Sequence, residues 1–166
     1  QLLSDLIQAL GTGTGGKYKD EELRYERIII MTDADVDGAH IASLLMTFFY
    51  QEMRPLIENG HLFLAVAPFY KLTHGAKTVY AINDQHREEL LKKEFPANAK
   101  VAIGRFKGLG EMNPGELKAT TMDPKARTLL KVEIAEADRE AVSDAVNTLM
   151  GTKPELRFRF IQERAA

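Results

Sequence analysis

Residues 27–49 have the sequence RIIIMTDADVDGAHIASLLMTFF, which combines an Ile-rich run, an acidic turn and a helix pattern. The run at 27–32 predicts a short strand buried on both faces, because its apolar residues are consecutive rather than alternating. After the turn, apolar residues recur at the spacing of an amphipathic helix, at Ile41, Leu44, Leu45, Phe48 and Phe49. A buried strand followed by a long helix predicts an α/β fold with a parallel sheet.

Further elements are predicted on both sides of this stretch. A helix over 1–10 should end at Gly11, and Pro55 should kink or restart the long helix. The other predicted elements are a glycine-rich loop (11–16), a polar helix (19–27), strands (61–67, 101–106, 129–134), a hairpin (70–82) and helices (83–95, 138–150, 154–164).

The composition limits the class of protein. The 166 residues are 45% hydrophobic and 28% charged, as in a soluble globular protein, and no apolar run approaches the roughly 20 residues of a membrane span. The absence of cysteine excludes a disulfide scaffold and a thiolate zinc site, and it fits a reducing cytoplasm. A net charge of −2 means that any DNA contact must come from local basic clusters or from a partner that supplies the rest. Because the chain starts at Gln1 within a helix pattern, we expect a piece of a longer protein.

Three carboxylates alternate in the acidic turn, at Asp33, Asp35 and Asp37. On an extended chain this spacing places at least two of them on one side, in a shared pocket at the strand end where open α/β sheets bind ligands. A hard divalent cation held by one or two carboxylates and completed by water or phosphate is the usual way to offset such charge, so the turn predicts a site for a divalent cation. Two alternatives remain: Asp37 could simply cap the following helix, or the turn could belong to an aspartate-based phosphatase. An EF-hand is excluded because its twelfth position is Leu44 rather than Glu.

A second candidate site is RFKGLGEM at 105–112. Arg105 and Lys107 supply charge, while Gly108 and Gly110 allow close backbone approach to a phosphate; the alternative is an ordinary turn with solvated charges. His40 could orient a ligand or serve only a structural role. GTGTGGKY (11–18) nearly matches a phosphate-binding P-loop, but it follows a helix and has Tyr18 in place of Ser or Thr, so a flexible connection is expected.

The stretch IIIMTDADVDGAHIASLLMTFFYQEM (28–53) resembles the TOPRIM domain of bacterial type IIA DNA topoisomerases. RFKGLGEM (105–112) and TTMDPKARTLL (120–130) are similar to the B subunits of the same enzymes, in the same order, and look closer to topoisomerase IV than to gyrase. The resemblance implies that 1–68 is the C-terminal part of a Rossmann-like TOPRIM domain. Residues 69–166 would then be an α+β tail region that contacts TOPRIM and the A subunit.

The resemblance also implies the chemistry. Asp33 and Asp35 would be catalytic Mg²⁺ ligands with Asp37 auxiliary, while the nucleophilic tyrosine lies on the A subunit of an A2B2 heterotetramer acting on double-stranded chromosomal DNA. The family's metal-binding glutamate, in an E-G-D-S-A segment, does not occur here, and ATP would bind a domain absent from this chain. The chain alone should therefore be inactive in strand passage, relaxation or decatenation. A non-catalytic docking module for the A subunit and DNA is the remaining alternative.

Overall fold

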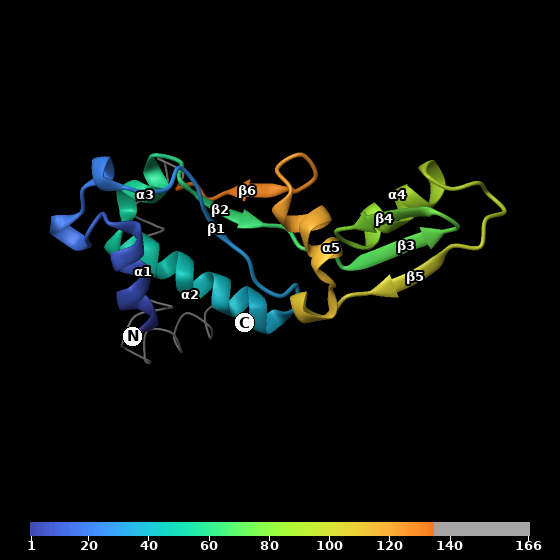
Figure 1. Ribbon diagram of the computed structural model, residues 1–166, viewed down its shortest axis with the longest axis horizontal. Helices are drawn as coiled ribbons and strands as arrows, with labels where there is room; N and C mark the ends of the chain where they lie inside the picture. Colours follow the sequence, from blue (N-terminus) through green and yellow to red (C-terminus); the bar gives the residue numbers. More distant parts are fainter. Residues whose placement is uncertain (135–166) are drawn as a thin grey trace, which may run out of the picture. The chain divides into compact units, whose positions relative to one another are not determined.

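The computed structural model describes residues 1–134, whose helices and strands are labelled in Figure 1. The chain divides into two compact units. Among the described residues, one contains 1–28, 43–62 and 131–134; the other contains 29–42 and 63–130. Both units are discontinuous, because the chain passes from one to the other and returns. The predicted helices over 138–150 and 154–164 lie outside the described residues.

The first helix, α1 (Leu2–Leu10), is confirmed with its predicted end. Gly11 has the left-handed conformation (φ 82°), and its N–H donates to the Ile7 carbonyl, which closes the helix as glycine commonly does. The glycine-rich loop that follows contains one 3-10 turn, η1 (Gly15–Lys17).

The predicted polar helix over 19–27 is wrong, since only a single 3-10 turn forms, η2 (Asp20–Glu22). Helices in proteins are stabilised mainly by packing an apolar face, and this segment has few apolar side chains to pack. In addition, the Asp20 carboxylate accepts hydrogen bonds from Tyr18 Oη (2.6 Å) and Asn59 Nδ2 (3.0 Å), which tie the turn to a distant part of the chain.

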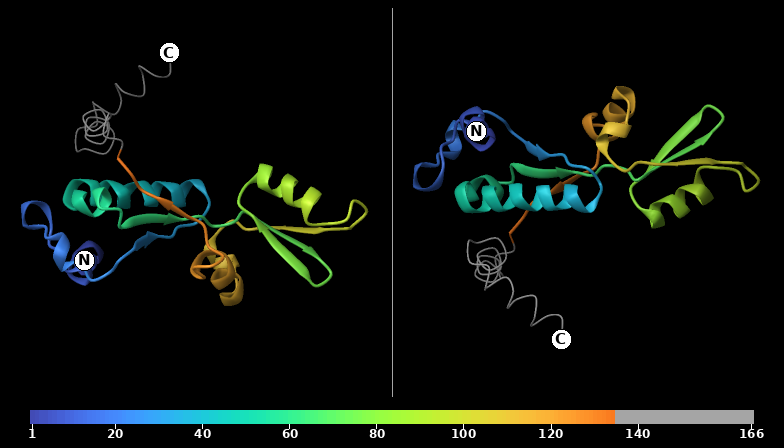
Figure 2. Two further views of the ribbon diagram at one scale, coloured as in Figure 1. Left: turned by 90° about the horizontal axis from the view of Figure 1, so that it is seen from above. Right: turned by 90° about the horizontal axis from the view of Figure 1, so that it is seen from below.

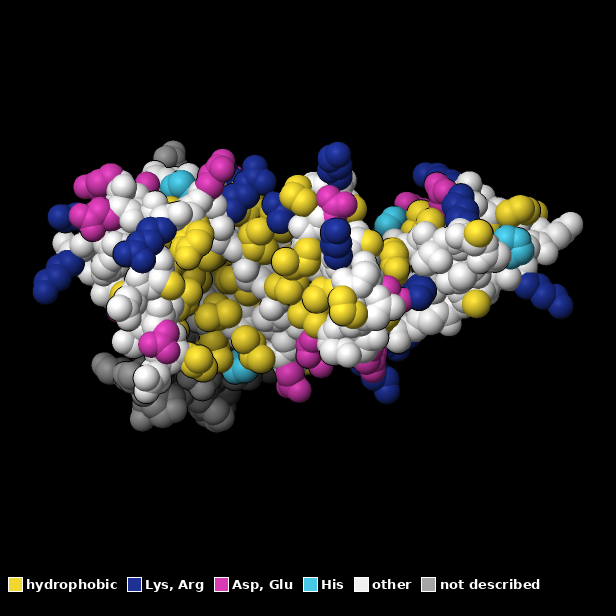
Figure 3. All heavy atoms as spheres, viewed as in Figure 1, with side chains coloured by type: hydrophobic (Ala, Val, Ile, Leu, Met, Phe, Trp, Pro, Cys, Tyr) yellow, Lys and Arg dark blue, Asp and Glu magenta, His cyan; other side chains and the backbone are white. Residues whose placement is uncertain are grey.

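The long helix and its interruption are confirmed as α2 (Val36–Glu52) and α3 (Arg54–Glu58), with Pro55 in the first turn of α3. Its apolar face is only partly buried. Phe49 is buried as the spacing predicts, whereas Ile41 (51% exposed) and Leu44 (48% exposed) are not, because no described element covers them. In Figure 3 hydrophobic side chains accordingly reach the surface over β1 and α2.

The first sheet has the strand order β1 (Ile28–Ile30), β2 (Leu62–Ala65), β6 (Leu129–Lys131). Ile28 N donates to the His61 carbonyl at the start of both β1 and β2, so these two strands run parallel, with α2 and α3 between them. The β2–β6 pair is antiparallel, since Val132 N donates to Leu62 O and Val66 N donates to Thr128 O. The predicted parallel pair is confirmed, and β6 makes the sheet mixed.

The second sheet is antiparallel, with order β4 (Lys77–Ala81), β3 (Tyr70–His74), β5 (Ala102–Arg105), which confirms the hairpin and the next strand. Helix α4 (Asp84–Lys93) covers one face of this sheet (Figure 2). Its predicted cap is also confirmed, because the Asn83 side chain accepts from His86 N at 2.7 Å. Leu72 is completely buried within this unit.

After β5 the chain forms three short helical segments that the sequence did not predict. They are η3 (Leu109–Glu111), α5 (Pro114–Leu117) and a π-turn (Lys118–Met122). Asn113 and Glu116 form a capping box at the start of α5. Among residues 1–134, no helix combines the length and the apolar character that a membrane span requires.

Candidate active site

Asp33 lies just beyond the end of β1, with its side chain exposed. One of its carboxylate oxygens accepts a hydrogen bond from Leu109 N at 2.7 Å. Gly108 lies directly against the same carboxylate, since a methyl group on Gly108 would come within 3.1 Å of its carbon and both oxygens. The KGLG segment (107–110) therefore fixes the position of Asp33, although Leu109 and Asp33 are 76 residues apart in the sequence.

Asp35 lies immediately before α2 and caps it. Its carboxylate accepts a hydrogen bond from Gly38 N at 2.7 Å, the usual arrangement of an aspartate at a helix start. The alternative in which Asp37 caps the helix is therefore wrong, because Asp35 makes this hydrogen bond and Asp37 lies exposed in the first turn. The chain is extended only as far as Asp33, since a bend at Ala34 and Asp35 leads into the helix.

Gly38 has a packing role that its place after Asp37 did not reveal. The residue is buried, and a methyl group added to it would overlap the backbone carbonyl of Asp33. The first turn of α2 thus packs against the backbone that carries the first aspartate. A glycine is required here for close approach of two backbone segments, not for an unusual φ angle.

The two aspartates fit a divalent cation of the Mg²⁺ type. The second oxygen of each carboxylate accepts no hydrogen bond from a described residue, and both side chains are exposed. Carboxylate oxygens are the ligands that Mg²⁺ takes in small numbers, completing its octahedron with water or phosphate. Within residues 1–134 there is no group of three or more acidic or histidine side chains that could hold a metal. Asp37 therefore does not join the other two in a protein-only cage.

A cavity of about 600 Å³ opens beside Asp35. Its lining combines Asp35 with two cationic residues, Arg105 and Lys107, and with apolar and aromatic residues. The full lining is Ala34, Asp35, Val36, Ala39, Phe69, Arg105, Phe106 and Lys107. Asp33 does not line this cavity, so a pocket shared by the two aspartates stays a prediction.

The remaining predicted site residues surround this region. Arg105 ends β5 and is exposed, as is Lys107, whose backbone N–H donates to the Glu111 carboxylate at 2.6 Å. Gly110 is exposed, with open space where a side chain would point. His40 is exposed on α2, and its ring makes no hydrogen bond to another described residue. The structure therefore brings Arg105 and Lys107 to Asp35, and Gly108 to Asp33.

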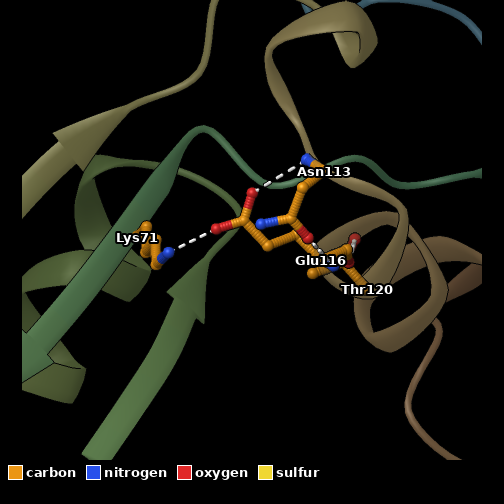
Figure 4. Close-up of polar contacts among 4 residues, drawn as sticks. All are labelled: Lys71, Asn113, Glu116 and Thr120. Carbon is orange, nitrogen blue, oxygen red and sulfur yellow. Dashed lines mark hydrogen bonds and ion pairs between the residues drawn. The ribbon is translucent and has the colours of Figure 1, made fainter.

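An ion pair links the second sheet to the helical segment that follows the KGLG loop (Figure 4). Lys71 on β3 contacts the carboxylate of Glu116, whose side chain is only 11% exposed. The other Glu116 oxygen accepts from Asn113 N at 3.1 Å. Lys71 and the Asn113 N–H lower the pKa of Glu116. The Glu116 carboxylate in turn raises the pKa of Lys71. Sequence reasoning missed this pair, whose only local signal is the N-x-x-E spacing of a capping box.

Three tyrosines, Tyr18, Tyr70 and Tyr80, have surroundings that oppose their activation as nucleophiles. Burial, and then the hydrogen bond to Asp20, raise the pKa of Tyr18, while a hydrogen bond to Asp84 raises that of Tyr70. Burial raises the pKa of Tyr80 as well. A raised pKa keeps the phenol protonated, which is the opposite of what a nucleophile needs.

Two family models match the chain. The Toprim domain matches residues 3–67, and the carboxyl terminus of the DNA gyrase B subunit matches residues 98–162. The two matches follow each other in sequence order and leave only the hairpin and α4 region between them unmatched.

Curated relatives match along nearly the whole chain. The B subunit of DNA topoisomerase 4 from Caulobacter vibrioides is 64% identical over 163 residues, which are 98% of this chain and 23% of the relative. The corresponding protein from Bartonella bacilliformis is 62% identical over 163 residues, 98% of this chain and 24% of the relative. The B subunit of DNA gyrase from Metamycoplasma hominis is 51% identical over 164 residues, 98% of this chain and 25% of the relative. The chain thus spans about a quarter of the length of these relatives.

Proposed function

Since this chain belongs to the B subunits of type IIA DNA topoisomerases, we propose that it supplies two aspartate ligands, Asp33 and Asp35, to the magnesium site that cleaves and reseals DNA. The observation that supports this most strongly is the pair of exposed carboxylates beyond β1. Asp33 is held through one oxygen by Leu109 N and Asp35 through one oxygen by Gly38 N, while the other oxygen of each accepts no hydrogen bond from residues 1–134.

The fixed oxygens give the two aspartates a defined orientation before any ligand arrives. A carboxylate loses side-chain conformational entropy when it binds a metal. The hydrogen bond to a backbone N–H already restricts both of these side chains, so the further loss on binding is smaller. Bound Mg²⁺ would offset the negative charge that develops on the scissile phosphate and the departing 3′ oxygen. Asp37, exposed in the first turn of α2, would contribute through its charge rather than as a direct ligand.

Arg105 and Lys107 would hold the DNA backbone beside this centre. Both are exposed and line the cavity next to Asp35, so a phosphate there can meet cationic side chains on one side and the acidic site on the other. The nucleophilic tyrosine would come from the partner A subunit in an A2B2 assembly, and ATP would bind elsewhere in the full-length protein. The 166-residue chain alone is expected to leave supercoiled DNA unchanged.

The test uses the full-length protein assembled with its A subunit. Asp35→Asn is the sharpest variant, because the amide oxygen can still accept from Gly38 N and keep the helix cap while the charge is lost. We expect Asp35→Asn and Asp33→Asn each to lower Mg²⁺-dependent DNA cleavage by at least about 100-fold, since a metal ligand contributes several kcal/mol. Asp37→Asn should lower it far less.

Assembly with the A subunit, followed by size-exclusion chromatography, controls for misfolding. Cleavage at the wild-type rate by both Asp33→Asn and Asp35→Asn would refute the metal-site proposal. It would leave a docking module for the A subunit and DNA as the function of this chain.

A further inference from the structure

The cavity beside Asp35 has two aromatic rings in its wall that a phosphate site does not require. Phe69 and Phe106 lie side by side, just before β3 and just after β5, because Phe106 N donates to the Phe69 carbonyl at 2.8 Å and continues the β3–β5 pairing. Both rings are half-buried, so each is held in the wall yet keeps exposed surface. Arg105 and Lys107 flank Phe106 in the sequence and line the same cavity.

We propose that this cavity binds one unstacked nucleotide of single-stranded DNA, with its base on Phe69 or Phe106 and its phosphate on Arg105 and Lys107. The inference rests on the proposed function, since it assumes that DNA reaches this surface. Aromatic rings interleaved with cationic side chains are how proteins bind single strands, because every base offers a π-face and every nucleotide a phosphate.

The size and rigidity of the cavity fit such a ligand. Its volume of about 600 Å³ lies within the range of small-molecule sites and far exceeds the space that a lone phosphate or hydrated ion needs. The Phe106 ring is fixed by stacking on Tyr80, with ring centres 6.4 Å apart and planes 24° apart. A ring that is already ordered loses little side-chain entropy when a base stacks on it.

The ligand should be single-stranded rather than duplex DNA. In a duplex the faces of the bases are covered by their neighbours, so only phosphates can reach the cavity, and the two phenylalanine rings would gain nothing. A base can enter only where the strand is interrupted or unpaired. A break in the strand beside Asp35, as the proposed function requires, would produce such an end.

The Asp35 carboxylate in the same wall makes a separate prediction about phosphate binding. Its negative charge repels a phosphate unless a divalent cation lies between them, so Mg²⁺ should strengthen the phosphate contribution. The contribution of the base, in contrast, depends on the rings and should not require the metal. The two contributions can therefore be measured independently.

The experiment measures fluorescence anisotropy of the 166-residue chain with a labelled short oligothymidylate and with an abasic oligonucleotide of the same length. We expect the oligothymidylate to bind about 5- to 150-fold more tightly, the range given by stacking of one base. Phe106→Leu should remove most of this preference while leaving abasic affinity unchanged, and Phe69→Leu provides a second variant should the first fail to fold. Tyr25→Leu, which alters an exposed aromatic side chain outside the cavity, should leave the preference intact.

Equal affinity for the two oligonucleotides, or a preference that survives both phenylalanine substitutions, would overturn the proposal. Preferential binding of duplex DNA of the same sequence would do so too. Asp35→Asn separates this inference from the proposed function. It should abolish the effect of Mg²⁺ on binding and keep the base preference. An Mg²⁺ effect that survives in Asp35→Asn would contradict the proposed function, whereas a missing base preference would contradict the nucleotide site.

Discussion

The carboxylate of Asp33 accepts a hydrogen bond from Leu109 N at 2.7 Å, although the two residues are 76 positions apart in the sequence. Gly108 lies against the same carboxylate, where a methyl group would come within 3.1 Å of it. The KGLG segment and the acidic turn are thus two halves of one local structure. Close approach to DNA is therefore not the only reason for a glycine in this segment, because Gly108 packs against the Asp33 carboxylate.

Gly108→Ala is expected to impair the metal site without removing any charged group. The added methyl group would press on the Asp33 carboxylate and displace it by a fraction of an ångström, since the φ angle at Gly108 (−153°) suits any residue. Misplacement of a catalytic group by about 1 Å can cost about 100-fold in rate, so we expect a loss of about 10- to 100-fold. The measurement is Mg²⁺-dependent DNA cleavage by the full-length enzyme.

Gly110→Ala is the matched control, because nothing lies within 4 Å of the methyl group that it would add. It should cleave DNA at close to the wild-type rate. Equal rates for both variants would show that contact between Gly108 and Asp33 has no part in catalysis.

Gly38→Ala should destabilise the fold itself. Its methyl group would overlap the backbone carbonyl of Asp33, and backbone cannot rotate away as a side chain can. Overpacking typically costs about 1–3 kcal/mol, and we expect the upper end of that range here. Urea unfolding of the chain followed by circular dichroism would report the loss. Gly16→Ala, which adds a methyl group in open space, should change the unfolding midpoint very little.

Lys107→Ala and Arg105→Ala should each weaken binding of duplex DNA by the full-length enzyme, regardless of sequence. If each side chain neutralises one phosphate, the slope of log affinity against log salt should become shallower by about 0.9 for each variant. Lys100→Ala removes an exposed lysine that does not line the cavity and should leave the slope unchanged. Equal slopes for the three variants would mean that Arg105 and Lys107 contact no phosphate and that 105–108 is an ordinary turn.

Glu116→Gln should lower stability at neutral pH but not at acid pH. Lys71 and Asn113 N–H lower the pKa of Glu116 below its ordinary value of 4.5. The ionised Glu116 carboxylate therefore contributes its full stabilisation of the folded state above pH 4.5. It is lost as the pH falls through the lowered pKa of the folded state, when the native carboxylate becomes protonated. At pH 7 we expect the variant to melt roughly a few degrees below wild type. The two melting temperatures should converge as the pH falls below 4.5.

The matched control for that pair is Glu94→Gln. Lys77 lowers the pKa of Glu94 in the same direction, but both side chains of this pair are exposed, so the pair contributes less. A difference between wild type and Glu116→Gln that persisted once the pH had fallen through the lowered pKa of Glu116 and its carboxylate was protonated would mean that packing, not charge, accounts for the effect of the substitution.

Local sequence signals predicted the elements on which the site is built. The Ile-rich run gave β1, Pro55 separated α2 from α3, and Asn83 capped α4, each within a residue or two of its expected place. The polar segment 19–27 failed because charged residues alone do not hold a helix in place. Residues 109–122 were missed because their short helical turns have no repeated apolar spacing.

Asp33 and Asp35 could be identified from the sequence as ligand candidates, because a carboxylate's chemistry and its place after a strand are both local properties. Only the tertiary structure decided that Leu109 N and Gly38 N each hold one of them, and that Asp35 rather than Asp33 lines the cavity with Arg105 and Lys107. The physical reason is that helix and strand patterns depend on neighbours a few residues apart. Which distant loop meets which carboxylate depends on how the strands and their connections pack, and residue spacing carries no record of that packing.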